Sequence, residues 1–146
     1  MASTVFPVAS AGKTRYVVTL LTGTSYTVPA GALYLNVKLF GGGGSGGAGY
    51  ADYNMALGND GIGGSVIAST LSSTPGNSIA YAIGAGGVAT GTGVGGNTTF
   101  TGATTANGSG VTTGPTGEGA KNGGYASRGA SSYDGGSGKI EVEYWA

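Results

Sequence analysis

Glycine constrains this chain more than any other residue, because 34 of its 146 positions are Gly, about 23%, against roughly 7% in an average protein. Inside a helix each glycine costs about 1 kcal/mol relative to alanine. No window of ten or more residues shows the apolar spacing of a helix. Large aliphatic and Phe side chains are also scarce, so the core must be small. The sequence therefore predicts no helix.

The apolar residues gather in short runs with the period of two that is typical of strands. We expect strands at 16–21, 33–40, 65–71, 78–83, 98–101 and 139–145. The run 16–21 is either buried on both faces or an edge of the core. A terminal strand as regular as 139–145 needs a partner, which we expect to be 33–40 or 16–21. The predicted fold class is all-β, a small β-sandwich.

Two glycine-rich stretches, 41–64 and 84–138, are expected to project from this sandwich as long loops. Loops longer than about 15 residues are normally functional or disordered. A third option is that their segments pack as polyproline II (polyglycine II) helices, which glycine permits because no Cβ separates neighbouring backbones. The sequence leaves these options open.

Composition removes most catalytic and cofactor classes. The chain has no His and no Cys, which excludes zinc fingers, iron–sulfur clusters, disulfides and Ser-His-Asp triads. We expect no enzyme, no cofactor, no metal site, no nucleic-acid binding and no membrane insertion. Glu141 and Glu143 are interpreted as a solvated strand face, the alternative being a carboxylate pair for glycoside hydrolysis. Asp52, Asp60 and Asp134 lack the ligand density of a cation site.

Tyrosines in the glycine-rich stretches are the best candidates for recognition, since Tyr offers a large rigid face at small entropic cost. The alternative is that these rings cover a small core of the loops themselves. Arg128 and Lys121 lie nearby and could pair with an anionic sugar or phosphate, or remain solvated charges. The candidate receptor-binding residues are Tyr50, Asp52, Tyr53, Asn54, Tyr125, Arg128 and Tyr133.

Several blocks in a fixed order resemble the glycine-rich domain at the ends of bacteriophage tail fibre proteins. The blocks are Tyr26-Thr27-Val28-Pro29-Ala30-Gly31, then the strand 33–40 with Gly41-Gly42-Gly43-Gly44, Gly47-Ala48-Gly49-Tyr50, Tyr81-Ala82-Ile83-Gly84-Ala85-Gly86-Gly87, Gly95-Gly96-Asn97-Thr98-Thr99-Phe100 and the closing strand. The resemblance covers about residues 16–145.

The resemblance implies a virion protein, a tail fibre or spike tip, that presents its loops to a host surface glycan or outer-membrane protein. It implies residues 16–146 as one domain and a homotrimer, since fibres are usually trimers. Residues 1–15 would form an arm that anchors the domain to another virion protein through residues 3–8. The alternatives are a purely structural capsid or tail decoration protein and an ice-binding protein.

Overall fold

The computed structural model describes residues 12–45, 63–88, 93–109 and 134–146, and every regular element in them is a strand. The strands are β1 (Arg15–Leu20), β2 (Ser25–Thr27), β3 (Tyr34–Phe40), β4 (Val66–Ser72), β5 (Ser78–Ala82), β6 (Thr99–Phe100) and β7 (Lys139–Trp145). This part of the chain holds no helix that could span a membrane.

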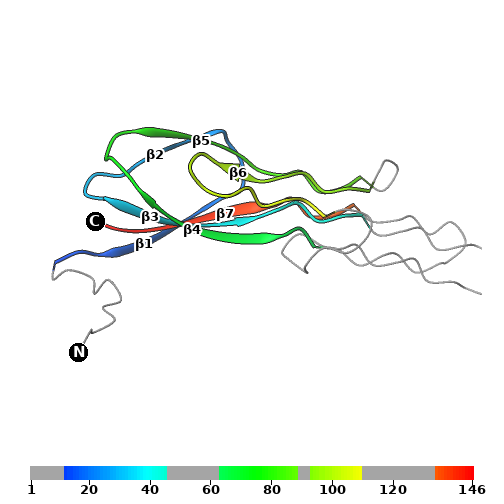
Figure 1. Ribbon diagram of the computed structural model, residues 1–146, viewed down its shortest axis with the longest axis horizontal. Coiled ribbons are helices and arrows are strands. Elements are labelled where there is room, and N and C mark those ends of the chain that lie inside the picture. The colour runs from blue at the N-terminus through cyan, green and yellow to red at the C-terminus, as the bar shows by residue number, and fades with distance from the viewer. Residues whose placement is uncertain (1–11, 46–62, 89–92, 110–133) are drawn as a thin grey trace, which may run out of the picture.

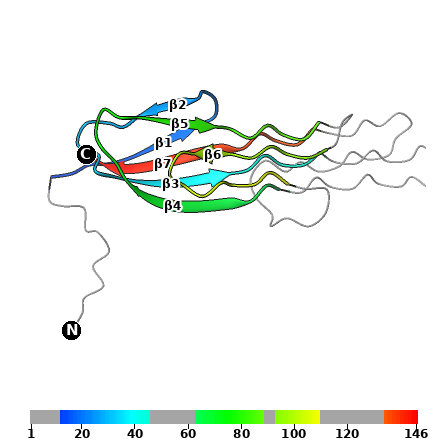
Figure 2. The same ribbon diagram turned by 45° about the horizontal axis from the view of Figure 1, so that its top comes forward.

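The strands form two antiparallel sheets that pack face to face (Figure 1). The larger sheet has the order β1-β7-β3-β4 and the smaller has the order β2-β5-β6. Figure 2 shows the two layers with the glycine-rich segments running on from one end. The predicted all-β sandwich is confirmed.

The last strand closes the larger sheet as predicted. Strand β7 pairs with β1 on one side and β3 on the other, with Val142 opposite both Val18 and Val37. Its alternation turns Ile140, Val142 and Tyr144 toward the smaller sheet, where each is at most 9% exposed. The run 16–21 corresponds to the edge strand β1. Of the two alternatives for this run, the edge of the core is confirmed and burial on both faces is wrong, because nothing covers its outer side among the described residues.

The core is mainly aliphatic on the larger sheet, with Tyr144 as an exception, and mainly aromatic on the smaller. Leu35 and Leu39 are fully buried on the inner face of β3. Opposite them, Phe100 lies with its ring centroid 6.1 Å from that of Tyr26 and 6.4 Å from that of Tyr81. A centroid spacing of this size is typical of favourable ring pairs. These three aromatic rings hold the smaller sheet against the larger one.

Two elements differ from the prediction. Strand β2 was missed, because its three residues contain one apolar side chain, Tyr26, and cannot show a period. The idea that 84–138 projects wholly as a loop is also wrong. Phe100 and Ala106 are buried in the core, because the bridge between Thr98 and Ala106 folds this stretch back onto the smaller sheet.

Two glycine-containing turns lie at the end of the sandwich that carries Ala146. Ala32 N donates to Pro29 O at 3.2 Å, and Asn77 N donates to Thr74 O at 3.1 Å. The third residue of each turn is a glycine with positive φ, +82° at Gly31 and +84° at Gly76. A type II turn requires such a φ at this position, which explains why the sequence places Gly there.

Candidate functional site

The segment 41–45 continues directly from β3 and is surrounded by glycine-rich backbone. Gly41, Gly42, Gly43 and Gly44 are all buried, although none has a side chain to bury. The segment exchanges main-chain hydrogen bonds with five neighbours: Gly41 N with Ser65 O, Gly42 N with Gly96 O, Gly43 N with Gly136 O, Ser109 N with Gly42 O, and Gly87 N with Gly43 O, all at 2.8–3.0 Å. We call these six segments (41–45, 63–65, 84–88, 93–97, 107–109 and 134–138) the glycine bundle.

Hydrogen bonds in the glycine bundle recur every three residues. Gly42 N donates to Gly96 O, and Ser45 N, three residues later, donates to Gly93 O, three residues earlier. The same spacing relates Gly138 N to Gly84 O and Gly135 N to Gly87 O. Polyproline II has three residues per turn, so this spacing is the one it would give. The described segments therefore pack through main-chain hydrogen bonds at the spacing expected of polyproline II.

The close approach of backbones explains the glycine content. A Cβ built on Gly42 would lie 2.1 Å from Ala85 O, and one on Gly135 would lie 2.0 Å from Gly43 O. Ordinary contacts begin at about 3.4 Å. At these positions any side chain would separate the segments and break their hydrogen bonds.

Thr98 joins the glycine bundle to the sandwich. Its hydroxyl is fully buried, donates to Phe40 O at 2.7 Å and accepts from Gly84 N at 2.9 Å. Three chain segments therefore meet at one side chain, where the strands end and the bundle begins. Sequence reasoning placed this residue in a short strand and did not identify its role.

The predicted recognition residues do not fall in the described part of the chain. Tyr50, Asp52, Tyr53 and Asn54 lie between Ser45 and Gly63 in the sequence, where the chain leaves and re-enters the glycine bundle. Tyr125, Arg128 and Tyr133 lie between Ser109 and Asp134, which are also bundle residues. Whether these residues come together stays a prediction.

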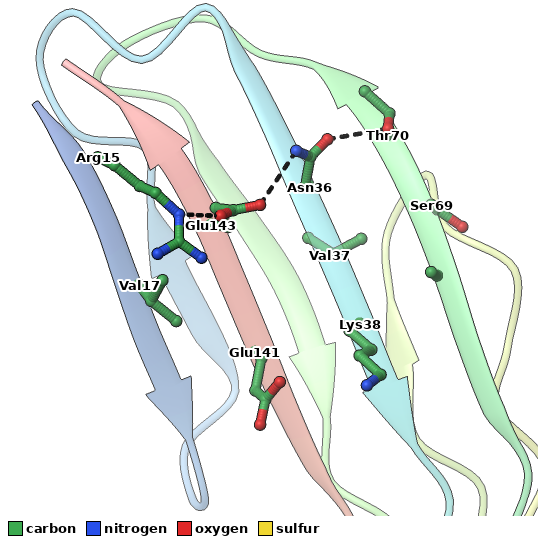
Figure 3. A pocket seen from close by; sticks show the side chains of 10 residues that line it. Arg15, Val17, Asn36, Val37, Lys38, Ser69, Thr70, Glu141 and Glu143 are labelled. Carbon is green, nitrogen blue, oxygen red and sulfur yellow. Dashed lines mark hydrogen bonds and ion pairs between the residues drawn. The ribbon is translucent and has the colours of Figure 1, made fainter. Parts of the chain in front are cut away.

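The outer face of the larger sheet carries the second feature, a row of hydrogen-bonded polar side chains across all four strands (Figure 3). Arg15 Nε donates to Glu143 Oε1. Asn36 Nδ2 donates to Glu143 Oε2 at 3.3 Å, and Thr70 Oγ1 donates to Asn36 Oδ1 at 2.9 Å. We call these four residues the polar row.

The polar row borders an open hollow of about 440 Å³, whose lining also includes Lys38 and Glu141. At one end Phe40 lies beneath two ammonium groups, with Lys38 Nζ 5.0 Å and Lys139 Nζ 4.6 Å from the ring centroid. Lys139 also pairs with Glu141 at 3.1 Å. Glu141 and Glu143 thus share one face, as predicted, and each is paired with a cation. Strand alternation predicted their face but not the hollow, because which strands are neighbours is a tertiary property.

The described residues include one tyrosine with a raised pKa, two buried hydroxyls without a hydrogen-bond partner and no metal-binding cluster. Burial, and to a smaller extent Tyr144, raise the pKa of Tyr26 to about 12. This hydroxyl has no hydrogen-bond partner in the described chain, as is true of Ser109 Oγ. No group of three or more Asp or Glu side chains within 12–45, 63–88, 93–109 and 134–146 could hold a metal ion.

Together these features define a class of protein: a small β-sandwich that continues at one end into a backbone-bonded glycine bundle. The sequence matches the model of the glycine-rich domain family over residues 19–143, so the chain belongs to this family. The match spans all of the sandwich except residues 15–18 of β1 and 144–145 of β7. No curated protein sequence matches the chain.

Proposed function

We propose that this chain is a bacteriophage virion protein, a tail fibre or spike tip that binds a host cell-surface receptor. The observation that carries the proposal is that the two ends of the domain differ. Thr14 and Ala146 exchange backbone hydrogen bonds at 2.9 and 3.1 Å at one end of the sandwich. The glycine bundle extends from the opposite end (Figures 1 and 2). A domain with Thr14 and Ala146 at one pole and the glycine bundle at the other is suited to display.

The glycine bundle supports this role because its order does not depend on apolar side chains. Main-chain hydrogen bonds fix the points at which the chain leaves and re-enters it, among them Ser45 and Ser109. Rigid exit points lower the entropic cost of ordering a binding surface. The candidate contacts remain Tyr50, Asp52, Tyr53, Asn54, Tyr125, Arg128 and Tyr133. The receptor would be a surface glycan or an outer-membrane protein, and no enzymatic step or cofactor is needed.

A homotrimer would make weak single sites effective through multivalency. Both edges of the larger sheet lack a partner strand in the described chain. Strand β4 contains no charged residue and no proline, the devices that usually protect an edge. Because β1 and β4 run in opposite directions, β4 of one copy can pair antiparallel with β1 of the next. Copies related by rotation about the strand direction would then point their glycine bundles the same way.

The test is attachment of the purified protein to host cells. Fluorescently labelled protein should bind saturably to susceptible cells and compete with the phage. Changing Tyr50, Tyr53, Tyr125 and Tyr133 together to Ala should abolish binding while the melting temperature stays the same, because these residues lie outside the sandwich strands. Unchanged binding would remove the tyrosines from the proposal. Residues 3–8 are the proposed anchor to another virion protein, so deleting them should release the protein from the particle without loss of cell binding.

The second candidate is a capsid or tail decoration protein without a receptor, and the unprotected edge of β4 favours it. Such a protein would saturate the particle surface and fail to coat cells. Immunogold labelling of intact particles separates the two: label at fibre tips supports adhesion, whereas label spread over the capsid or tail supports decoration.

A further inference from the structure

Most charged residues in the described part of the chain lie on one surface. Of the seven charged residues that this part holds, five lie on the outer face of the larger sheet: Arg15, Lys38, Lys139, Glu141 and Glu143. The outer face of the smaller sheet is equally exposed to water but consists of uncharged residues, namely Ser25, Thr27, Ser78, Ala80 and Ala82. Small polar and Ala side chains are thus sufficient for a solvated sheet face in this fold. The charges on the larger sheet need another explanation.

The polar row is already arranged for binding. Glu143 receives hydrogen bonds from Arg15 on one side and Asn36 on the other, and Asn36 is held in turn by Thr70. Side chains fixed by such bonds lose little freedom when a ligand arrives. In Figure 3 the two terminal nitrogens of the Arg15 guanidinium point away from Glu143 and toward Val17, on the face of the hollow. Both remain donors for a ligand.

Lys38 carries a positive charge that is not paired with either carboxylate of the hollow. Arg15 is paired with Glu143, and Lys139 is paired with Glu141. Lys38 has no ion pair in the described chain, and its ammonium lies over Phe40 beside the hollow. Three cations therefore face two carboxylates. The surplus positive charge favours a ligand with one anionic group.

The other groups of this face fit hydroxyls. A hydroxyl donates to a carboxylate and accepts from a guanidinium or amide, and Glu141, Glu143, Arg15 and Asn36 offer both kinds of partner within one hollow. Tyr34 lies on the same face, two residues before Asn36, and is 62% exposed, so its ring is available for stacking. Lys38 lies two residues after Asn36, about 7 Å along the strand. One sugar ring with a carboxylate substituent spans such a distance.

We propose that this hollow binds an acidic saccharide, with the carboxylate of a sugar ring at Lys38 and its hydroxyls on the polar row. This site lies on the flank of the sandwich, so it is separate from the contacts proposed at the end of the glycine bundle. It does not require those contacts to exist.

The probe is a dimer of galacturonic acid, added to the isotope-labelled full chain and followed by amide chemical shifts. We expect saturable shifts at Asn36, Lys38 and Thr70. Lys38→Gln should weaken binding about tenfold, the usual effect of losing a hydrogen bond to a charged group. The matched control is Lys13→Gln, the same change at a lysine that bonds Gly31 O at 3.0 Å and does not line the hollow. It should leave binding within about twofold.

Three results would overturn the proposal: no saturable shift, equal losses from Lys38→Gln and Lys13→Gln, or the same shifts with sodium acetate, which carries a carboxylate and no sugar. A neutral galactose dimer separates the two parts of the claim. Binding about tenfold weaker than that of the acid supports the carboxylate contact with Lys38, whereas equal binding refutes it. Thermal melting of both variants checks that neither substitution unfolds the chain.

Discussion

Gly42→Ala tests whether backbone contact holds the glycine bundle together. Gly42 does not have a positive φ, so alanine meets no dihedral strain there and the added methyl group is the only perturbation. That methyl carbon would lie 2.1 Å from Ala85 O, and ordinary contact begins at about 3.4 Å. The two segments would have to move apart by about 1.3 Å.

Such a movement exceeds what the hydrogen bonds of Gly42 can tolerate. Gly42 N donates to Gly96 O at 2.9 Å, and Gly42 O accepts from Ser109 N at 3.0 Å. Leaving a buried donor or acceptor unpaired costs about 1–3 kcal/mol each. For these two groups the substitution should therefore lower the free energy of unfolding by about 2–6 kcal/mol, a large part of the roughly 5–15 kcal/mol of a typical domain.

The control is Gly76→Ala, which has the same effect on the unfolded chain. Gly76 has φ +84° in an open turn, and a methyl group added there would meet nothing within 4 Å, so its cost is dihedral strain of about 1–2 kcal/mol. Urea unfolding followed by the fluorescence of Trp145 measures both variants. If Gly42→Ala costs no more than Gly76→Ala, the glycine bundle is not held by close backbone contact.

Three further predictions concern buried hydrogen-bonding groups. Thr98→Val removes a hydroxyl with two buried partners and should cost about 2–4 kcal/mol, whereas Thr101→Val, at an exposed hydroxyl, should cost under about 1 kcal/mol in the same urea assay. The pKa of the Tyr26 hydroxyl is raised to about 12. The stability that depends on the neutral hydroxyl is therefore complete below about pH 10 and is lost, by at most about 3 kcal/mol, as the pH rises toward 12. Tyr26→Phe should remove this loss and cost nothing at neutral pH, because the hydroxyl has no partner in the described chain. In hydrogen exchange, the amides of Gly43 and Gly87 should be protected as strongly as those of β3, and exchange at the rate of a free peptide would contradict their bonds.

The alternation of apolar residues was enough to predict most of the sandwich. It located six of the seven strands, because the period of two fixes which side chains must be covered. The sequence offered β3 or β1 as the partner of β7, and in the structure β7 pairs with both. The exception, β2, is short, and its Tyr26 belongs to the core through tertiary contacts such as that with Phe100. A contact of this kind depends on the fold and has no local sequence signal.

The glycine-rich part was predictable in kind but not in detail. Abundant glycine without a helical or collagen period indicated backbone packing as one option. It did not indicate that 41–45 is the central segment or that its partners are 63–65, 84–88, 93–97, 107–109 and 134–138, because one glycine is chemically identical to another. The polar row was missed for a related reason: Arg15, Asn36 and Thr70 are far apart in sequence and become neighbours only through the strand order.

Stability and recognition should separate in this domain. Most hydrogen bonds of the glycine bundle join main-chain groups, so a position such as Gly42 is constrained mainly by the lack of room for a side chain. None of the main-chain hydrogen bonds found among the described bundle segments needs a tyrosine side chain. Substitutions at Gly42 or Thr98 are therefore expected to lower the free energy of unfolding, and to lower receptor binding only as far as the protein unfolds. Substitutions at the tyrosines should lower binding alone, which lets receptor specificity change without cost to the fold.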